Sequence, residues 1–302
     1  MTILDCRPFL AVGVSFIAAV LIAFSRRWPN LRETWSVIAS VLKFGIILSM
    51  LPAVLDGNQY QWTLCQITDT VGLTLRTDPA GMIFAVLASM LWVPMNFYSI
   101  GYMRCNNESE QTGYFAAFAI CMSAVMGIAM AENLLTFFIF YELLTLASYP
   151  LVLHKRNQEA LMASRKYLIY TLISGQLFLA GVIAVYCISG TMDFTPGGFL
   201  TTDMAPRWVL QAIFVLMILA GSVKAAVMPL HGWLPAAMIA PTPVSALLHA
   251  VAVVKTGVFA VLRIIGFVFG PKLLAEIGVV DVLAWAAAAS IIISSLIALR
   301  QD

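Results

Sequence analysis

The chain has 302 residues, of which 61% are hydrophobic and 11% are charged, and its formal net charge is +2. A soluble domain carries about 25% charged residues, so a surface exposed mainly to water is excluded. A charge this small and scattered also argues against nucleic-acid binding. We therefore expect an all-α integral membrane protein.

Nine apolar runs follow one another along the chain, and each is long enough to cross a bilayer as a helix of about 20 residues. The first run follows Asp5 and Arg7 and lacks a signal-peptide cleavage site, so we expect it to be a membrane helix. The predicted spans are 9–25, 36–55, 80–99, 113–131, 133–153, 166–188, 208–230, 243–267 and 275–299.

The longest connection, residues 56–79, separates the second and third spans. Apolar and polar residues alternate over 71–78 (VGLTLRTD), which predicts a short hairpin on one face of the membrane.

Lysine and arginine are unevenly divided between the two sides. The loops after odd-numbered spans hold Arg26, Arg27, Arg32, Arg104, Lys155, Arg156, Arg165, Lys166 and Arg300. The opposite side holds Arg7, Arg76, Arg207, Arg263 and Lys272. The positive-inside rule then predicts an outside N-terminus and a cytoplasmic 154–166 loop.

Sequence motifs for other chemistry are missing. The chain has no nucleotide-binding glycine motif and no GxSxG or HExxH motif. Its cysteines form no CxxC pair, and His154, His231 and His249 do not have metal-ligand spacing. We expect no cofactor, no metal and no redox centre in this chain.

Ionisable residues inside the apolar runs carry the functional signal, because such residues are costly in lipid and often mark an ion path. Glu142 lies in the middle of a span, far from any loop, and its alternative role is an inert protonated carboxyl group. Lys224 precedes Pro229 by five residues, and a proline within a span predicts a helix break beside the lysine. Burial favours proton release by a lysine and a nearby carboxylate favours retention, so a glutamate–lysine pair can act as a switch.

His249 and Lys255 share a span and are six residues apart, which in a continuous helix separates their directions by about 120°. Both could border one polar channel, although a lone membrane histidine is often a packing residue.

Two further candidates have simpler explanations. Lys43 could extend its long side chain to the interface, and Glu132 could suit the dipole at a helix start.

A long signature supports one family. HGWLPAAM (231–238), APTPVSALLHA (240–250) and VKTGV (254–258), with YSIGYM (98–103) and ENLL (132–135), resemble the antiporter-like subunits. These are proton-pumping subunits of respiratory complex I, Mrp-type cation/proton antiporters and membrane-bound hydrogenases.

The resemblance implies a relay. Glu142 is similar to the glutamate on the family's fifth helix, although Tyr141 stands where many members have Trp. Lys224 is similar to the lysine paired with that glutamate, His249 to the eighth-helix histidine, and Lys255 to the central lysine that passes protons onward. Lys43, Glu132 and His231 are candidate accessory residues.

The resemblance also implies an organisation. Family members have about 14 helices in two inverted five-helix repeats, each with a broken helix. We expect N-terminal helices 1–3 with the hairpin over 1–112, a proton-conducting repeat of helices 4–8 over 113–267, and the first helix of a truncated second repeat over 268–302. A separate chain would then supply helices 10–14.

The expected function is proton translocation, with Na⁺ as the alternative ion, in a multisubunit complex of a prokaryotic plasma membrane. The coupled reaction would be NADH/quinone-type or hydrogenase-type electron transfer in partner chains. Two alternatives remain open: a coupling subunit for inorganic-carbon uptake with a zinc-containing soluble partner, and a structural fragment without transport.

Overall fold

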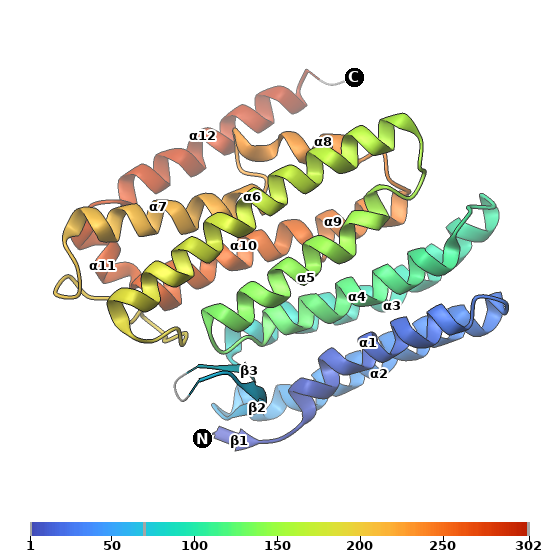
Figure 1. Ribbon diagram of the computed structural model, residues 1–302, viewed down its shortest axis with the longest axis horizontal. Helices are drawn as coiled ribbons and strands as arrows, with labels where there is room; N and C mark the ends of the chain where they lie inside the picture. Colours follow the sequence, from blue (N-terminus) through green and yellow to red (C-terminus); the bar gives the residue numbers. More distant parts are fainter. Residues whose placement is uncertain (1, 69–70, 301–302) are drawn as a thin grey trace.

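Long apolar helices dominate the computed structural model, which describes residues 2–68 and 71–300 (Figure 1). Within these ranges nine helical segments are long and apolar enough to cross a membrane. They are Arg7–Phe24, Pro29–Leu55, Pro79–Cys105, Gln111–Ala129, Leu134–Val152, Gln158–Ser189, Arg207–Lys224, Thr242–Ile277 and Val280–Ala298. The predicted all-α membrane fold with nine spans is confirmed, and the chain is a multi-pass membrane protein.

Several spans are divided into shorter helices. The helices are α1 (Arg7–Phe24), α2 (Pro29–Leu55), α3 (Pro79–Cys105), α4 (Gln111–Ala129), α5 (Leu134–Val152), α6 (Gln158–Ser189), α7 (Arg207–Lys224), the 3₁₀ turn η1 (Leu230–Gly232), α8 (Trp233–Ala237), α9 (Thr242–Ala250), α10 (Val253–Arg263), the π-helical segment η2 (Ile264–Phe269), α11 (Gly270–Ile277) and α12 (Val280–Ala298).

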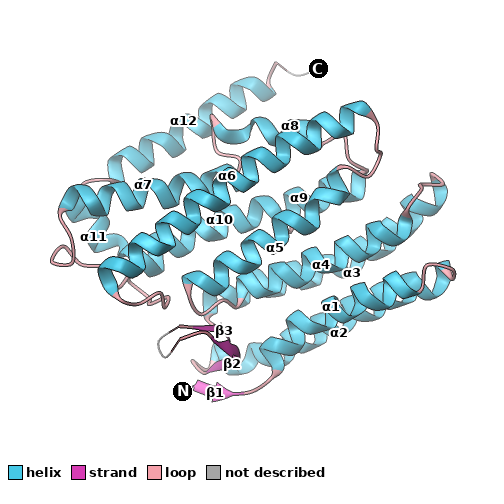
Figure 2. Cartoon of the chain, viewed as in Figure 1, coloured by secondary structure: helices cyan, strands magenta, loops and turns pink. Residues whose placement is uncertain are grey.

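A three-stranded sheet lies at one end of the helices, which we call the sheet end (Figure 2). Strand β2 (Gln59–Gln66) pairs antiparallel with β3 (Gly72–Arg76), so residues 56–79 contain the expected hairpin. Strand β1 (Thr2–Leu4) pairs parallel with β2, which the sequence analysis did not predict. The sheet attaches the start of α1 to the hairpin that leads into α3.

The loops α1–α2, α3–α4 and α5–α6 gather at the opposite end, here called the loop end (residues 25–28, 106–110 and 153–157; Figure 1).

Side-chain caps fix the starts of three helices. Asp78, Asn133 and Asn157 each accept a hydrogen bond from the backbone amide three residues later, at 2.6, 2.8 and 2.7 Å. Such caps satisfy amides that have no partner within the helix.

Helix α4 forms the centre of the bundle and packs against α1 on one side and α5 on the other. Its residues are apolar nearly all round, as expected for a helix enclosed by protein. Helix α12 is the opposite case, because none of its residues is buried against the rest of the described chain. It runs along the periphery in Figure 1, so its apolar surface is free for lipid or protein contacts.

Helix breaks interrupt the seventh and eighth predicted spans. Helix α7 stops at Lys224, and η1 and α8 follow after Pro229, which confirms the break predicted from the proline. The eighth span is also broken, since α9 ends at Ala250 and α10 begins at Val253. The prediction of one continuous helix over 243–267 was therefore wrong.

Candidate functional site

Lys224 ends α7 inside the bundle and is completely buried. Its Nζ donates a hydrogen bond to the backbone carbonyl of Tyr141 at 2.5 Å and lies 3.2 Å from the centre of the Tyr141 ring. The carbonyl and the face of the aromatic ring both stabilise a cation. Lys224 on α7 is thus held by one residue of α5, Tyr141, without a direct ion pair.

Glu142 is the neighbour of Tyr141 on α5 and is partly buried. Its Oε1 atom is buried and has no hydrogen-bond partner in the described chain. The seven ion pairs within 4.0 Å in that part of the chain do not include Glu142 or Lys224. Lys224 therefore contacts Tyr141, the residue next to Glu142 in the sequence, and forms no salt bridge with Glu142 itself.

Space for the Glu142 carboxylate comes from Gly175 on α6. A Cβ atom built on Gly175 would lie 2.1 Å from Glu142 Oε1, far inside van der Waals contact. The absence of a side chain at this position is what allows the carboxylate to pack against the α6 backbone.

A hydroxyl cluster extends from Tyr141 toward the helix break. The Tyr141 hydroxyl lies 3.0 Å from Ser174 Oγ, and both donate to the carbonyl of Ala220, at 3.1 and 2.7 Å. One turn along, Trp233 Nε1 donates to the carbonyl of Val223 at 2.7 Å. These side chains add hydrogen bonds to carbonyls near the end of α7, and Val223 also accepts from the backbone amide of Ala226.

Close packing of α10 fixes the same break from the other side. A Cβ atom on Gly257 would lie 2.2 Å from the backbone nitrogen of Ala225 and 2.6 Å from the carbonyl carbon of Lys224. Only glycine permits this approach. Sequence analysis did not identify Tyr141, Ser174, Gly175 or Gly257 as parts of the site, because none of them is charged.

His249 and Lys255 lie on the exposed side of α9 and α10 in the described chain. His249 Nε2 is 3.3 Å from the sulfur of Met238. The helix is interrupted at Val251 and Ala252, between the two residues, so the angle of 120° calculated for one continuous helix does not apply. No hydrogen bond or ion pair in the described residues joins them to Glu142 or Lys224.

His231 lies in η1, and its Nδ1 atom is buried without a hydrogen-bond partner among the described residues. Pro229 immediately precedes η1 and stands inside the break after α7. Both residues therefore belong to the interrupted part of the seventh span.

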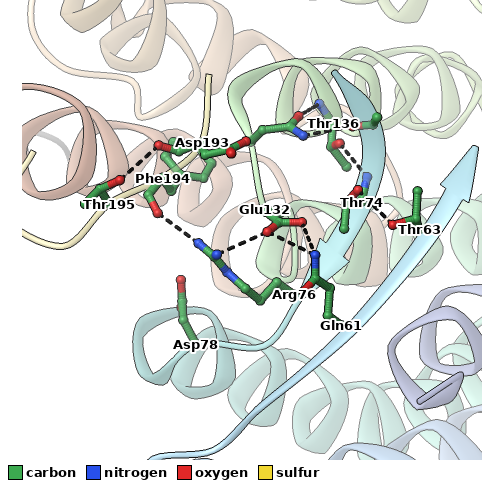
Figure 3. A network of polar contacts seen from close by, with 12 residues as sticks. Gln61, Thr63, Thr74, Arg76, Asp78, Glu132, Thr136, Asp193, Phe194 and Thr195 are labelled. Carbon is green, nitrogen blue, oxygen red and sulfur yellow. Dashed lines mark hydrogen bonds and ion pairs between the residues drawn. The ribbon is translucent and has the colours of Figure 1, made fainter. Parts of the chain in front are cut away.

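Glu132 lies in the short loop between α4 and α5, at the sheet end. Its Oε1 forms an ion pair with Arg76 Nη1 at 3.1 Å, and Gln61 Nε2 donates to Oε2 at 3.0 Å (Figure 3). Arg76 also donates to the carbonyl of Phe194 at 2.9 Å. The interpretation of Glu132 as a simple helix-dipole residue was incomplete, because its carboxylate binds both strands of the hairpin and Arg76 extends the connection to the loop of Phe194.

The electrostatics of this loop follow from burial. Burial raises the pKa of Glu132 above its ordinary value, while Arg76 acts in the opposite direction. Desolvation also raises the pKa of Asp193, although its side chain is more exposed than that of Glu132, and Arg76 again acts in the opposite direction. One arginine thus faces two carboxyl groups in a partly dehydrated setting (Figure 3).

Lys43 does not reach an interface. It is completely buried on α2, its Nζ donates to the carbonyl of Met122 at 2.7 Å, and it lies 4.8 Å from the centre of the Trp92 ring. The prediction that its side chain extends to the membrane surface was wrong, because the packed face of α2 points inward at this position.

A second unexpected charge pair joins distant parts of the chain. Arg263, which we assigned to a surface, is buried at the end of α10 and pairs with Asp78 at the start of α3. The guanidinium group also lies 4.6 to 5.0 Å from the centres of three phenylalanine rings, those of Phe194, Phe259 and Phe267.

No group of three or more His, Cys, Asp or Glu residues in the described ranges could hold a metal ion.

Comparison with known proteins agrees with this architecture. Residues 131–302 match the family model described as NADH:quinone oxidoreductase/Mrp antiporter, transmembrane. This match covers more than half of the chain, and the protein belongs to that family of antiporter-like membrane subunits.

Curated relatives extend the similarity toward the N-terminus. A putative antiporter subunit mnhA2 of Staphylococcus haemolyticus is 28% identical over 268 residues, which cover 88% of this chain and 33% of the relative. The NAD(P)H-quinone oxidoreductase subunit 5 of the Paulinella chromatophora organellar chromatophore is 28% identical over 274 residues, covering 85% of this chain and 40% of the relative. The chain thus spans about a third of the length of these relatives.

Two solved structures share the fold. The archaeal membrane-bound sulfane sulfur reductase gives a TM-score of 0.77 at 23% identity, with 86% of this chain and 53% of the other chain covered. The Mrp complex of Dietzia sp. DQ12-45-1b gives a TM-score of 0.77 at 23% identity, with 89% and 29% covered.

Proposed function

We propose that this chain is a proton-translocating subunit of a multisubunit membrane complex, and that Glu142, Lys224, His249 and Lys255 carry the proton. The observation that carries the proposal is the buried Lys224 at the end of a broken membrane helix. Its amino group contacts Tyr141, the residue next to Glu142 in the sequence. A buried ionisable group beside a helix break is typical of ion pathways in membrane proteins.

The Glu142–Lys224 arrangement supports a switch. When Lys224 Nζ donates to the carbonyl of Tyr141, its charge is stabilised by a dipole and a ring, and Glu142 is left without a hydrogen bond. A side-chain rotation that brings the two groups into contact would favour the charged lysine, and separation would favour proton release. Water in the interruption after α7 would carry the released proton, since Pro229 has no N–H to donate and the backbone carbonyls of the break are polar.

His249 and Lys255 would take the proton onward. Both lie at or near the interruption between α9 and α10, and both are exposed on the described chain. A polar face of this kind in a membrane protein suits contact with further helices or with water inside a complex. We therefore place the exit of the pathway on this face.

The partners in this proposal are other membrane subunits. The similar proteins include a putative antiporter subunit and a subunit of an NAD(P)H-quinone oxidoreductase, and one solved structure with this fold is an Mrp complex. We propose the same kind of assembly here, with protons as the transported ion and electron transfer in partner chains as the driving reaction. The predicted location is a prokaryotic plasma membrane, with the N-terminus outside and the loop end in the cytoplasm.

The test is proton translocation by the assembled complex in liposomes, measured with a pH-sensitive dye. Replacement of Lys224 by Ala should reduce the rate by about tenfold or more, as for loss of a positioned proton carrier. Lys155→Ala, which removes an exposed lysine of the loop end, is the matched control and should leave the rate unchanged. Full translocation by the Lys224→Ala complex would exclude the proposed relay.

A further inference from the structure

Lys43 is a buried cation that the relay does not use. It lies near the middle of α2, is completely enclosed, and forms no ion pair within the described residues. Burial of an ammonium group without a counter-ion costs several kcal/mol. Its only polar contact within the described residues is the carbonyl of Met122, with the Trp92 ring alongside.

The elements packed against α2 bring no carboxylate to Lys43. The buried faces of α1 and α3 contain no charged residue near the middle of the bundle. The titratable residues buried on α4 and β2 are Tyr114, Cys121 and Tyr60. Each of these groups is neutral at neutral pH unless strongly perturbed.

A polar stripe leads along α2 from the loop end to Lys43. We call it the α2 seam, and it consists of Arg32, Glu33, Ser36, Ser40 and Lys43 on the buried face of the helix. Spacings of three and four residues place these side chains on one face, and the ten helical steps from Glu33 to Lys43 span about 15 Å. Beyond Lys43 the same face is apolar: Ile47, Met50 and Val54.

Side chains of α3 and α4 continue the polar character across from the seam. Ser36 Oγ donates to Asn96 Oδ1 at 2.8 Å, and Asn96 Nδ2 donates back to the carbonyl of Ser36 at 3.1 Å. The Tyr114 hydroxyl donates to Ser99 Oγ at 3.1 Å. All four residues are at most 2% exposed, so this is an internal polar zone and not part of the protein surface.

The seam opens at the loop end. A cavity of about 320 Å³ lies against Asn30, Glu33 and Arg104, and another of about 340 Å³ lies against Arg32 and Gln111, among other residues. The cavities therefore reach the first charged residues of the seam. Glu33, which is itself buried, pairs there with both Arg32 and Arg104.

Two buried polar atoms without a partner among the described residues lie on helices that pack against α2, one on α3 and one on α1. Trp92 Nε1 and Ser15 Oγ are buried and have no hydrogen-bond partner in the described chain. The Trp92 ring is the one beside Lys43. Because buried polar atoms are normally satisfied by protein or by internal water, the inner end of the seam suits an internal water molecule.

We propose that Lys43 is a second proton-binding site, reached from the loop end along the α2 seam and separate from the Glu142–Lys224 pair. A proton passes from water at the mouth to the lone pair of the Lys43 amine, and the ammonium group returns it by the reverse step. Lys43 lies outside residues 131–302, the part that matches the family model. This site does not depend on the proposed relay.

The direct test is NMR of the full chain in lipid nanodiscs with ¹⁵Nζ-labelled lysine. The signal that disappears in Lys43→Met belongs to Lys43, and Lys43→Arg serves as a second assignment that keeps the charge. We expect this signal to move from the ammonium to the amine position within the pH range over which the chain stays folded. A signal that stays at one position over this range would overturn the proposal.

The path is tested by the rate of proton exchange at the same signal. Asn96→Leu and Ser36→Val each remove polar groups from the seam, and either should slow exchange at least about tenfold. Met50→Leu, on the same face of α2 beyond Lys43, is the matched control and should not change the rate. Slower exchange in Met50→Leu, with unchanged exchange in both seam variants, would place the entrance at the sheet end and refute the proposal.

Discussion

The guanidinium group of Arg263 pairs with the carboxylate of Asp78, 185 positions earlier in the chain, in an environment closed to water. Asp78 also caps α3 by accepting from the amide of Gly81. The pair therefore connects the first helix after the hairpin to the end of α10, and both partners lack another strong counter-charge.

Removal of Arg263 should strongly destabilise the fold. Arg263→Leu leaves the Asp78 carboxylate buried and unpaired, and loss of one partner of a buried pair costs about 3 to 5 kcal/mol. Thermal unfolding in detergent measures the effect. Arg156→Ala, which breaks the exposed pair with Glu110, is the control and should cost no more than about 1 kcal/mol. The double variant Arg263→Leu with Asp78→Asn should recover part of the loss, and no recovery would contradict the pairing.

Gly175→Ala should impair transport more than folding. The added methyl group would occupy the position of the Glu142 carboxylate and force it to move, while the helical backbone of α6 accommodates alanine well. We expect proton translocation to fall about tenfold or more. Gly101→Ala is the control, because a Cβ atom there has no neighbour within 4 Å. Equal transport by both variants would show that the carboxylate position is not needed.

Trp233→Phe tests the support of the α7 break. The substitution keeps an aromatic ring in place but removes the N–H that binds the Val223 carbonyl, which should cost about 1 to 3 kcal/mol of stability. Trp208→Phe is the matched control on an exposed tryptophan and should have little effect. The shift in unfolding temperature of the two variants is the measurement, and equal shifts would contradict the assigned role.

His154, at the loop end, should make the fold sensitive to acid. Burial lowers the pKa of its imidazole in the folded chain, with Glu108 acting in the opposite direction. The unfolded state then binds more protons between the folded and unfolded pKa values, so stability rises with pH across that window. The stability that His154 contributes is present above its unfolded pKa and is lost as the pH falls through the folded value.

The measurement is the unfolding free energy of the native chain and of His154→Gln from pH 8 to pH 5. The native chain should lose more stability than the variant on acidification, since glutamine does not titrate. Parallel curves for the two proteins would refute the role of His154.

The spans and the two buried ionisable residues Glu142 and Lys224 were predictable because each depends on a local contrast in the sequence. Glu142 and Lys224 stand out inside apolar runs, and Pro229 marks the break next to Lys224. By contrast, no glycine or proline marks the interruption at Val251 and Ala252, so the pattern there is that of a continuous helix.

Long-range contacts were not accessible in the same way. Arg263 lies near the end of an apolar run, where an arginine normally reaches the interface, and nothing local points to Asp78. The prediction for Lys43 was wrong for a similar reason, because the packed face of α2 is decided by α1, α3 and α4. The neutral groups around Lys224, such as Gly175, acquire a role only when the helices are assembled.

The contact of Gly257 with the backbone of Lys224 and Ala225 has a mechanical consequence. Lys255 is two residues from this contact on the same helix, so the main chains that carry the two lysines are clamped together. The distance between the amino groups of Lys224 and Lys255 therefore cannot change by sliding of α10 past α7 unless this close backbone contact is broken. Side-chain rotation and the movement of water are the remaining adjustable parts, and both occur far faster than helix displacement.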